Sequence, residues 1–368
     1  MRSVVVLGAG LIGSSVGLAL TRRGVDVRLR DRDPATARLA ADLGAGRLDE
    51  EPGRGPGTGA EPADLAVLAV PPGQVAPVLV EAQRTGLART YTDVASVKGQ
   101  VRRDAERLGA ELASYVGGHP LAGRELSGPA GARSDLFEGR PWVLTPHADV
   151  AAEHVARAQA LVQLCAGVPV VLDEPEHDRA VALVSHGPHV LAALAAARLV
   201  DADPTTVQLA GQGVRDVTRV AASDAGLWVG ILAGNAAAVA TVLRDVRADL
   251  DSVLAALDAG PEHDPDEDAL VDVLRRGNAG RARLPGKPHV AGVTLAELPV
   301  VVRDRPGELA RLLADLAAEG TNLEDLTIEH SPAQPVGWVR IRVLPGRADG
   351  LAGHLRRCGW DVHLPPRR

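Results

Sequence analysis

The sequence predicts an α/β fold in which a parallel-sheet domain comes first, an all-helical domain follows, and a small βαββαβ domain ends the chain. Over the first ~170 residues, short apolar runs alternate with stretches of helical spacing, which is typical of a parallel sheet covered on both faces. From 174 to about 259 the apolar residues keep helical spacing, and alanine replaces the strand formers. From 298 onward strand and helix signals alternate again, in the order of a split βαβ sandwich.

Length and composition limit the class of protein. A chain of 368 residues is too long for one ordinary core, and we expect domains at 1–172, 173–288 and 296–368. The net charge of −7 argues against a general nucleic-acid binder, and we expect neither a membrane span nor a signal peptide. Two cysteines far apart, Cys165 and Cys358, indicate free thiols and a cytoplasmic location.

The first predicted strand leads into a glycine turn with the pattern GxGxxG. Gly8 allows the tight turn, Gly10 lets a diphosphate approach the backbone, and Gly13 lets the next helix pack on the strand. That helix begins at Leu11 and Ile12 and directs its N–H groups and positive dipole end at the diphosphate. The pattern predicts a Rossmann-type domain that binds a dinucleotide.

Asp31 indicates which dinucleotide is bound. It follows the second predicted strand, 18 residues beyond Gly13. A carboxylate at this place accepts both ribose hydroxyls and repels a 2′-phosphate, so we expect NAD rather than NADP. The neighbouring Arg32 is the feature that would suit NADP.

The remaining elements of the first domain follow from the same alternation. Helices are expected to begin near Leu11, Pro34, Gly73, Val97 and Val150. Strands are expected at Val4–Leu7, Val27–Arg30, Leu65–Val70, Thr90–Asp93, Tyr115–Gly117, Trp142–Thr145 and Val168–Leu172. The segment Glu50–Pro62 is rich in Gly, Pro and Glu and is expected to be a surface loop.

The alanine-rich helices of the second domain allow close helix packing. Such helices often pair across a two-fold axis, so we expect a homodimer. Beyond them, an acidic stretch (Gly260–Asp268) and a basic stretch (Arg275–Lys287) flank a short helix. Either this is a solvated linker, or Arg281, Arg283 or Lys287 forms an edge of the active site.

The third domain is expected to be a four-stranded sheet with two helices. Its elements are predicted at Leu298–Val302, Gly307–Ala318, Asn322–His330, Gly337–Val343, Ala348–Arg357 and Asp361–Leu364. The start of its first helix (Pro306-Gly307-Glu308-Leu309) and its exit (Gly320-Thr321-Asn322) resemble an ACT domain. This resemblance implies an amino-acid effector at a subunit interface, although split βαβ domains without a ligand are also common.

Two polar clusters follow strands at the carboxyl edge of the predicted sheet, where ligands bind. In the run Asp93–Lys98, Ser96 offers a hydroxyl and Lys98 a charge near the nicotinamide end of the cofactor. The alternative is that this run only caps the next helix. His119 lies between glycines and Pro120, unlike a core histidine among apolar neighbours. Because imidazole titrates near neutral pH, His119 suits acid–base work at an alcohol that is being oxidised.

A third cluster lies on the predicted helices. It comprises His177-Asp178, Ser185-His186-Gly187-Pro188-His189, Arg215-Asp216-Val217-Thr218-Arg219, Ser223-Asp224 and Trp228. No cysteine or carboxylate set completes a metal site with His186 and His189, so no metal is expected. A polar pocket with an arginine as anion clamp is expected, the alternative being that Arg215 and Arg219 form surface salt bridges.

Together these motifs resemble one family. GAGLIGSS, DVASVK, GGHPLAG, HDxxxALVSHGPH, GVRDVTRVAASD and GNAGRARLPGK are similar to the TyrA family, the prephenate and arogenate dehydrogenases of tyrosine biosynthesis. The resemblance spans residues 1 to about 288, and longer members carry an ACT-like tail. It implies NAD-dependent oxidative decarboxylation of prephenate to 4-hydroxyphenylpyruvate, or of arogenate to tyrosine, with tyrosine as a possible effector.

The same resemblance implies roles for individual residues. His119 would draw the proton off the ring hydroxyl, and Ser96 would hold that hydroxyl and orient His119. The substrate side would be formed by Arg219 as carboxylate binder, with His189, Ser185 and Trp228. Gly187 stands where the family usually has a larger apolar residue, and Ala225-Gly226-Leu227 replaces Pro-x-Met. Both departures are expected to change the shape of the pocket.

The sequence argues against two other functions. Hydroxyacid dehydrogenases with a Rossmann and a helical domain usually depend on a lysine from the helical domain, but no lysine occurs between Glu174 and Leu257. A sensor that binds NAD and an effector without turnover would need none of Ser96, His119 and Arg219. We therefore expect an enzyme.

Overall fold

A computed structural model describes residues 1–49, 61–123, 126, 128–258, 267–284, 295–330 and 336–363. The chain divides into two compact units, Met1–Arg247 and Ala248–Arg368. Most of the predicted loop Glu50–Pro62 lies outside the described residues, and so does Lys287.

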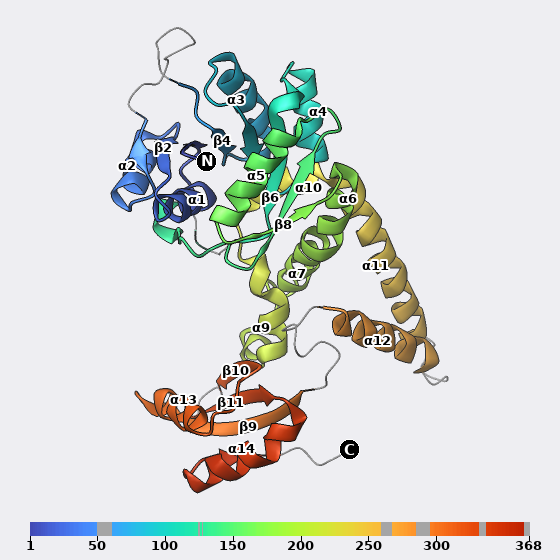
Figure 1. The fold of residues 1–368 in the computed structure, drawn as a ribbon. Coiled ribbons are helices and arrows are strands. Elements are labelled where there is room, and N and C mark those ends of the chain that lie inside the picture. The colour runs from blue at the N-terminus through green and yellow to red at the C-terminus, as the bar shows by residue number, and fades with distance from the viewer. Residues whose placement is uncertain are drawn as a thin grey trace. The chain divides into compact units, whose positions relative to one another are not determined.

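The first unit is built on an eight-stranded sheet with the order β3-β2-β1-β4-β5-β6-β7-β8 (Figure 1). Its strands are β1 Ser3–Leu7, β2 Asp26–Arg30, β3 Arg47–Leu48, β4 Leu65–Leu68, β5 Tyr91–Asp93, β6 Tyr115–Pro120, β7 Pro141–Pro146 and β8 Val168–Val171. The first six strands are parallel and have the order typical of dinucleotide-binding domains. The sheet confirms the predicted fold class.

The prediction of a wholly parallel sheet is wrong for the last two strands. β7 runs antiparallel to β6, with His119 opposite Val143 and Pro120 opposite Trp142. No α-helix lies between these strands in the described part of residues 121–140, so the chain returns along the same edge of the sheet without a crossover. β8 is parallel to β7 and keeps its reversed direction.

Helices cover both faces of this sheet. They are α1 Leu11–Thr21, α2 Pro34–Asp42, α3 Pro72–Arg84, α4 Gly99–Arg107 and α5 Ala152–Leu164. Buried residues of α1, α2 and α5 belong to one apolar cluster, and those of α3 and α4 belong to another. Each cluster lies on its own face of the sheet, as the predicted alternation of strands and helices requires.

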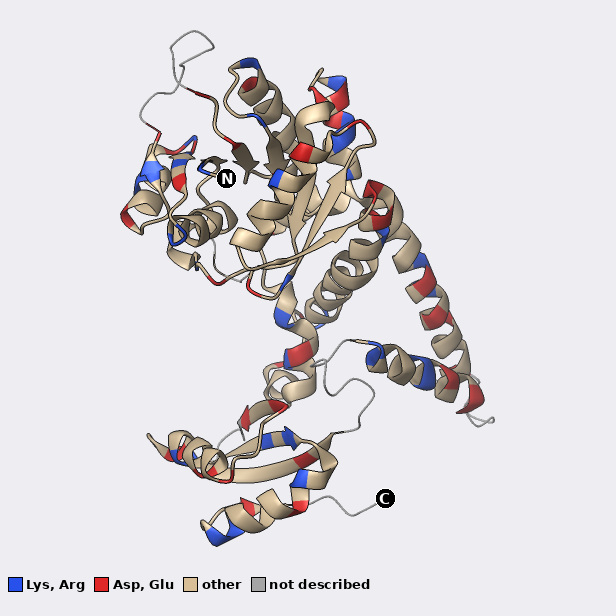
Figure 2. Ribbon diagram, viewed as in Figure 1, with Lys and Arg blue, Asp and Glu red and all other residues tan. Residues whose placement is uncertain are grey.

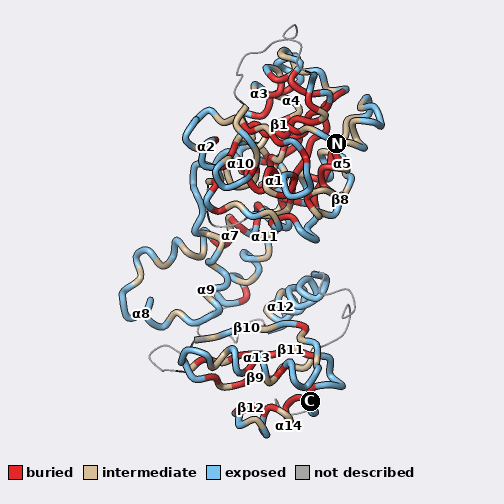
Figure 3. Tube along the Cα trace, turned by 60° about the vertical axis from the view of Figure 1, so that its left-hand side comes forward, coloured by how far each residue is buried: buried red, intermediate tan, exposed pale blue. Residues whose placement is uncertain are grey.

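The chain becomes helical after β8, as predicted. The helices are α6 Glu174–Val181, α7 Gly187–Ala197, α8 Pro204–Gln208, α9 Gln212–Thr218, α10 Ala225–Gly234, α11 Ala236–Leu257 and α12 Glu267–Ala282. A π-helical turn, Ala182–His186, joins α6 to α7. Much of α8, α9 and α12 is exposed (Figure 3).

Part of this helical segment is apolar enough to be compared with a membrane-spanning helix, which the sequence was not expected to contain. Among the described residues, Glu174–Ala197 is long and apolar enough to cross a membrane, and so is the pair α10–α11, although its two helices meet at 94°. The first run buries His177, His186 and His189 inside the unit. Since a core helix of a soluble protein passes the same test, length and composition here do not indicate a membrane span.

The second unit ends in the predicted βαββαβ arrangement. Its elements are β9 Ala296–Arg303, α13 Glu308–Ala318, β10 Asp325–His330, β11 Val336–Val343, α14 Pro345–Arg357 and β12 Asp361–Val362. The sheet has the order β10-β11-β9-β12, and all its neighbouring strands are antiparallel. Residues on β9 and β11 alternate between buried and half-buried, because α13 and α14 share one apolar cluster with a single face of the sheet.

Candidate functional site

The glycine turn after β1 has the geometry that a dinucleotide requires. Gly8 has φ +102°, and a Cβ there would lie 2.2 Å from the carbonyl oxygen of Ala69. A Cβ on Gly13 would lie 1.9 Å from the carbonyl oxygen of Gly8, whereas one on Gly10 would meet nothing within 4 Å. No side chain caps the helix start at Leu11 and Ile12. The turn therefore offers open space and backbone N–H groups to a diphosphate.

Asp31 lies beside this turn, at the end of β2. One of its carboxylate oxygens accepts a hydrogen bond from the N–H of Ala9 at 2.7 Å, and the other accepts one from the N–H of Asp33 at 2.9 Å. Each oxygen keeps a second lone pair for a ribose hydroxyl. The residue is half-buried and thus accessible from the carboxyl edge of the sheet.

His119 lies in β6, which continues to Pro120 rather than ending at Gly117 as predicted. The two glycines before it are sterically required. A Cβ on Gly117 would lie 2.4 Å from Oγ1 of Thr145, and one on Gly118 would lie 2.5 Å from the carbonyl oxygen of Asp93. Close approach of the neighbouring strands therefore explains the GGHP motif, and it holds His119 in the sheet with only 8% of its surface exposed.

Asp93 and Lys98 form a buried pair beneath this strand. The Lys98 ammonium bonds a carboxylate oxygen of Asp93 and the carbonyl oxygen of Gly118, the latter at 2.6 Å. The other oxygen of Asp93 accepts hydrogen bonds from the Tyr115 hydroxyl at 2.5 Å and from the N–H of Gly118 at 3.2 Å. Lys98 is 2% exposed. It was expected to offer a charge to a ligand, but in the structure it braces the strand that carries His119.

A chain of three side chains, which we call the relay, runs through the site: His119, His177 and Asp178. Nδ1 of His119 lies 2.8 Å from Nε2 of His177, and Nδ1 of His177 lies 2.8 Å from Oδ1 of Asp178. Asp178 also accepts hydrogen bonds from the backbone N–H groups of Lys98 and Gly99, at 3.0 and 2.9 Å. The relay thus ties β6 to α6 and to the start of α4.

Burial and neighbouring charges set the protonation of these groups. Burial, with His177, Lys98 and His186 nearby, holds the pKa of His119 well below its usual value. Burial alone would raise the pKa of Asp178, but hydrogen bonds from His177, Lys98 and Gly99 lower it overall. At neutral pH the site therefore contains a neutral His119 and an ionised Asp178, which is the state that a general base needs.

The predicted substrate side is partly assembled. His189 stacks on Trp228 with ring centroids 3.4 Å apart, and His186 meets the same indole edge-on at 6.1 Å. Asn235, at the junction of α10 and α11, donates hydrogen bonds to the carbonyl oxygen of Asp178 at 2.7 Å and to Nδ1 of His186 at 3.2 Å. Burial lowers the pKa of His186 to about 4, so this ring is neutral at physiological pH.

Other candidates occupy less defined positions. Arg219 is exposed, at the start of a 3₁₀ turn that packs against α7, the helix of His189. Ser185 is exposed within the π-helical turn. Ser96 is half-buried on the turn after β5, and the described partner that orients His119 is His177 rather than Ser96. Gly187 packs against α11, where a Cβ would lie 2.9 Å from Val242, so close helix packing explains its small size.

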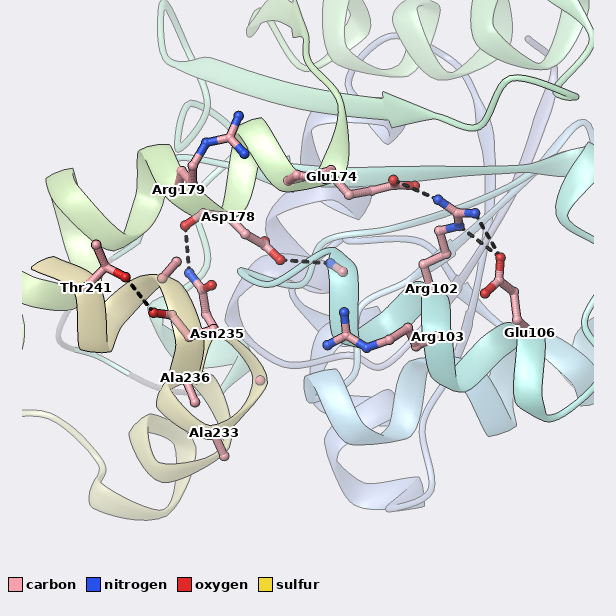
Figure 4. Close-up of a pocket in the computed structure, with 15 residues that line it drawn as sticks. Arg102, Arg103, Glu106, Glu174, Asp178, Arg179, Ala233, Asn235, Ala236 and Thr241 are labelled. Atoms are coloured by element: carbon pink, nitrogen blue, oxygen red, sulfur yellow. Dashed lines mark hydrogen bonds and ion pairs between the residues drawn. The ribbon is translucent and has the colours of Figure 1, made fainter.

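A cavity of about 770 Å³ lies behind the relay (Figure 4). It is bounded by α4, α6 and the start of α11, and Asp178 forms part of its wall together with Arg102, Arg103, Glu174 and Asn235. Arg102 is paired with Glu174 at 3.1 Å and with Glu106 at 2.9 Å. The outer end of the relay therefore faces this cavity, beyond His177 as seen from His119.

The sequence did not indicate the contacts that His177 and Asn235 make. His177-Asp178 is a recognisable polar motif, but nothing in the sequence connects it to His119, because the two histidines are 58 residues apart. Asn235 carried no signal beyond being a polar residue between two apolar helical runs. Among the described residues, no group of three or more His, Cys, Asp or Glu could hold a metal ion.

Two family models match the chain. The nucleotide-binding domain of prephenate dehydrogenase matches residues 16–171, and the dimerization domain of prephenate dehydrogenase matches residues 173–276. The boundary between the two matches falls at the end of β8, where the structure changes from sheet to helices.

Individual proteins match over greater lengths. A probable prephenate dehydrogenase of Streptomyces niveus is 42% identical over 370 residues, covering 99% of this chain and all of that protein. The solved structure of prephenate dehydrogenase from Aquifex aeolicus, in complex with hydroxyphenyl propionate and NAD⁺, is 27% identical with a TM-score of 0.65 and covers 76% of this chain and 97% of that one. Synechocystis arogenate dehydrogenase is also 27% identical, with a TM-score of 0.62 and coverages of 76% and 99%.

Proposed function

The chain belongs to the prephenate dehydrogenase family, and from this premise we propose that it catalyses the NAD-dependent oxidative decarboxylation of prephenate to 4-hydroxyphenylpyruvate, a step of tyrosine biosynthesis. The observation that carries the proposal is His119. It is a buried, neutral base on the same sheet edge as the glycine turn, and His177 engages its Nδ1 while leaving Nε2 for a substrate.

The topology suits a dinucleotide that bridges the turn and the base. β1 and β6 are separated by β4 and β5, so three strand spacings, roughly 14 Å in all, separate the glycine turn from His119. Gly8, Gly10 and Gly13 would hold the diphosphate, and Asp31 the adenosine ribose. When bound, NAD accepts the hydride at C4 of its nicotinamide.

In the proposed reaction His119 takes the proton of the ring hydroxyl while hydride leaves the same carbon. Ser96, at the carboxyl end of the neighbouring strand, would hold that hydroxyl. Loss of the ring carboxylate as CO₂ then makes the ring aromatic, which drives the step to completion. Burial keeps water from solvating His119 and thus supports its role as the base.

The substrate is an anion with two carboxylates, and it needs a cationic clamp. We assign this role to Arg219, with His189, Trp228 and Ser185 lining the same pocket. The stacked His189–Trp228 pair supports a flat wall suited to a ring. The likeness to Synechocystis arogenate dehydrogenase keeps arogenate as the alternative substrate, with tyrosine as its direct product.

Assembly, regulation and location belong to the same proposal. A homodimer fits the apolar side chains exposed on the helical segment, among them Leu183, Leu194 and Val229. The βαββαβ region is proposed to act like an ACT domain and to bind an amino acid such as tyrosine. A cytoplasmic location fits the two free cysteines.

The first experiment measures NAD reduction by the purified protein with prephenate and, separately, with arogenate, each with and without tyrosine. Turnover of prephenate is expected, and suppression by tyrosine would support an effector site. If neither substrate is oxidised, the proposed function is wrong. His119→Asn should lower turnover about 10³-fold while the affinity for NAD stays the same.

A pair of glycine variants tests the cofactor site separately from the chemistry. Gly10→Ala should fold normally but bind NAD poorly, because its Cβ points into open space that the diphosphate would occupy. Gly13→Ala should destabilise the first unit by about 3 kcal/mol or more, because its Cβ collides with the backbone. Calorimetric titration with NAD and thermal unfolding separate the two effects. Normal NAD affinity in Gly10→Ala would contradict the proposed diphosphate site.

A further inference from the structure

His177 and Asp178 have no task in the proposed reaction, yet the structure joins them to its base. His177 has none of its surface exposed, and both its ring nitrogens are engaged, Nε2 with His119 and Nδ1 with Asp178. A side chain so placed has no exposed surface for a substrate, and its link to the proposed reaction is its contact with His119.

The hydrogen bonds fix where each proton lies. The oxygens of Asp178 face the N–H groups of Lys98 and Gly99, which can only donate, so the ionised carboxylate accepts on every side. His177 must therefore donate from Nδ1, which leaves its Nε2 as the acceptor. In consequence His119 donates from Nδ1 and presents a bare Nε2.

We propose that His177 and Asp178 are positioning residues that hold His119 with a bare Nε2 and take up the positive charge that forms on it during turnover. The inference rests on the proposed function and deepens it. It is similar in logic to a catalytic triad in which a second imidazole separates the base from the carboxylate.

The proton balance of the reaction explains why such a device is useful. The hydroxyl O–H bond breaks and an Nε2–H bond forms on His119, while hydride passes to NAD. When CO₂ leaves, the electron pair of the broken C–C bond enters the ring, and the oxygen regains a proton from Nε2. The reaction therefore releases no net proton, and the relay has to store one proton only until decarboxylation.

Without the relay, the surroundings of His119 would disfavour the positive charge that forms when His119 takes up the proton. His119 is buried beside Lys98 and His186. The buried carboxylate of Asp93, at the end of the neighbouring strand, is already engaged by Lys98 and Tyr115. Asp178 can reach His119 only through His177: when the Nδ1 proton of His119 shifts toward Nε2 of His177, the positive charge comes to lie beside the carboxylate. The cavity behind Asp178 leaves room for water, which helps to keep that carboxylate ionised.

Matched variants of His177 test the proposal. In His177→Gln the amide oxygen can accept from Nδ1 of His119 and the amide NH₂ can donate to Asp178, so turnover should fall by about tenfold or less. In His177→Leu both contacts are lost, and turnover should fall about 100-fold or more. His154→Gln serves as control, since His154 is also a hydrogen-bonded histidine but bonds Thr90, outside the site.

Two further readouts separate positioning from mere structural support. In His177→Leu the acid limb of the kcat/KM–pH profile should move to lower pH, whereas a structural defect would lower the plateau and leave the limb in place. Asp178→Asn should behave like His177→Leu, because an amide NH₂ must face either His177 or the N–H of Gly99. Equal activity of the Gln and Leu variants, with an unmoved acid limb, would overturn the proposal.

Nitrogen-15 NMR of the unliganded protein tests the relay without any substrate. The imidazole of His119 should show a protonated Nδ1 and a bare Nε2, and a protonated Nε2 would overturn the relay. If the wild-type protein fails to oxidise prephenate but shows the expected tautomer, the proposed function is wrong while the arrangement of the relay stands.

Discussion

The part of the eight-stranded sheet around His119 and the four-stranded sheet differ in where their charged side chains lie. In the eight-stranded sheet, β6, β7 and β8 carry no charged side chain (Figure 2), and the charges around them, Asp93 and Lys98, are buried as a pair. In the four-stranded sheet, Arg340 and Arg342 form a ladder of ion pairs with Glu297, Glu329 and Asp325 on the face opposite the helices. These side chains are a quarter to a half exposed.

The difference shows what a buried charge indicates. An exposed ladder adds little to stability, because water solvates either partner when the other is absent. A buried pair is costly to form and more costly to break, so it is poor evidence of a gain in stability. In the large sheet the buried pair bonds both backbone groups of Gly118, so it fixes the position of the strand next to His119.

The largest effect is expected from Lys98→Met. It leaves the Asp93 carboxylate buried without its cation, and we expect the first unit to lose about 3–5 kcal/mol of unfolding free energy. Urea unfolding combined with hydrogen exchange of peptides from the two sheets would measure this loss. Protection of β9 and β11 should stay unchanged, and a loss below 1 kcal/mol would remove the contrast between the two sheets.

The second largest loss of stability is expected when the pH is lowered, and it should again differ between the two sheets. The pKa of His186 is lowered to about 4 and that of His119 lies well below 6.5. Between these values and pH 6.5 both histidines are therefore protonated in the unfolded chain but neutral in the folded one. Stability of the first unit is therefore fully present above pH 6.5 and falls as the pH drops from 6.5 toward 4.

In the small sheet the loss should begin at lower pH. A hydrogen bond from Arg340 lowers the pKa of Glu297 below its usual 4.5, so this ion pair keeps its stability above that pH and loses it below. Hydrogen exchange at pH 7 and pH 5, corrected for the intrinsic rate, should show weaker protection at pH 5 in β6 only. Parallel loosening of both sheets would contradict this expectation.

The smallest effect is expected from Arg340→Met. It removes the centre of the ladder, yet 41% of its side chain is exposed, and Glu297 and Glu329 can be solvated by water. The loss should be below about 1 kcal/mol. Thermal unfolding of this variant beside Lys98→Met compares the two sheets directly, and a similar loss in both would mean that burial does not set the cost.

Much of the fold was predictable because its signals are local. The apolar runs predicted β1, β2, β4 and β5 to within two residues at each end, and the order of elements from β9 to β12 was correct. β3 was missed because only two residues pair there, and the reversal of β7 was missed because strand direction depends on the connection rather than on the strand.

The candidate site was predictable in part for the same reason. The glycine turn, Asp31 and His119 can be recognised in the sequence by residue type and spacing. His189 and Trp228 were expected in one pocket, and in the structure their rings are stacked. The role expected of Lys98 was wrong, since the sequence gives a charge but not its burial. That Asp178 lies within hydrogen-bonding reach of α4 also depends on packing between distant segments.

The sequence by itself determined the nucleotide-binding turn, the fold class and a histidine set between glycines and a proline, because each of these depends on a few neighbouring residues whose chemistry is local. Only the tertiary structure decided which nitrogen of His119 is engaged, whether Lys98 faces a ligand or the core, and which carboxylate bonds His177. These outcomes depend on distances between side chains far apart in the chain, and packing alone sets those distances.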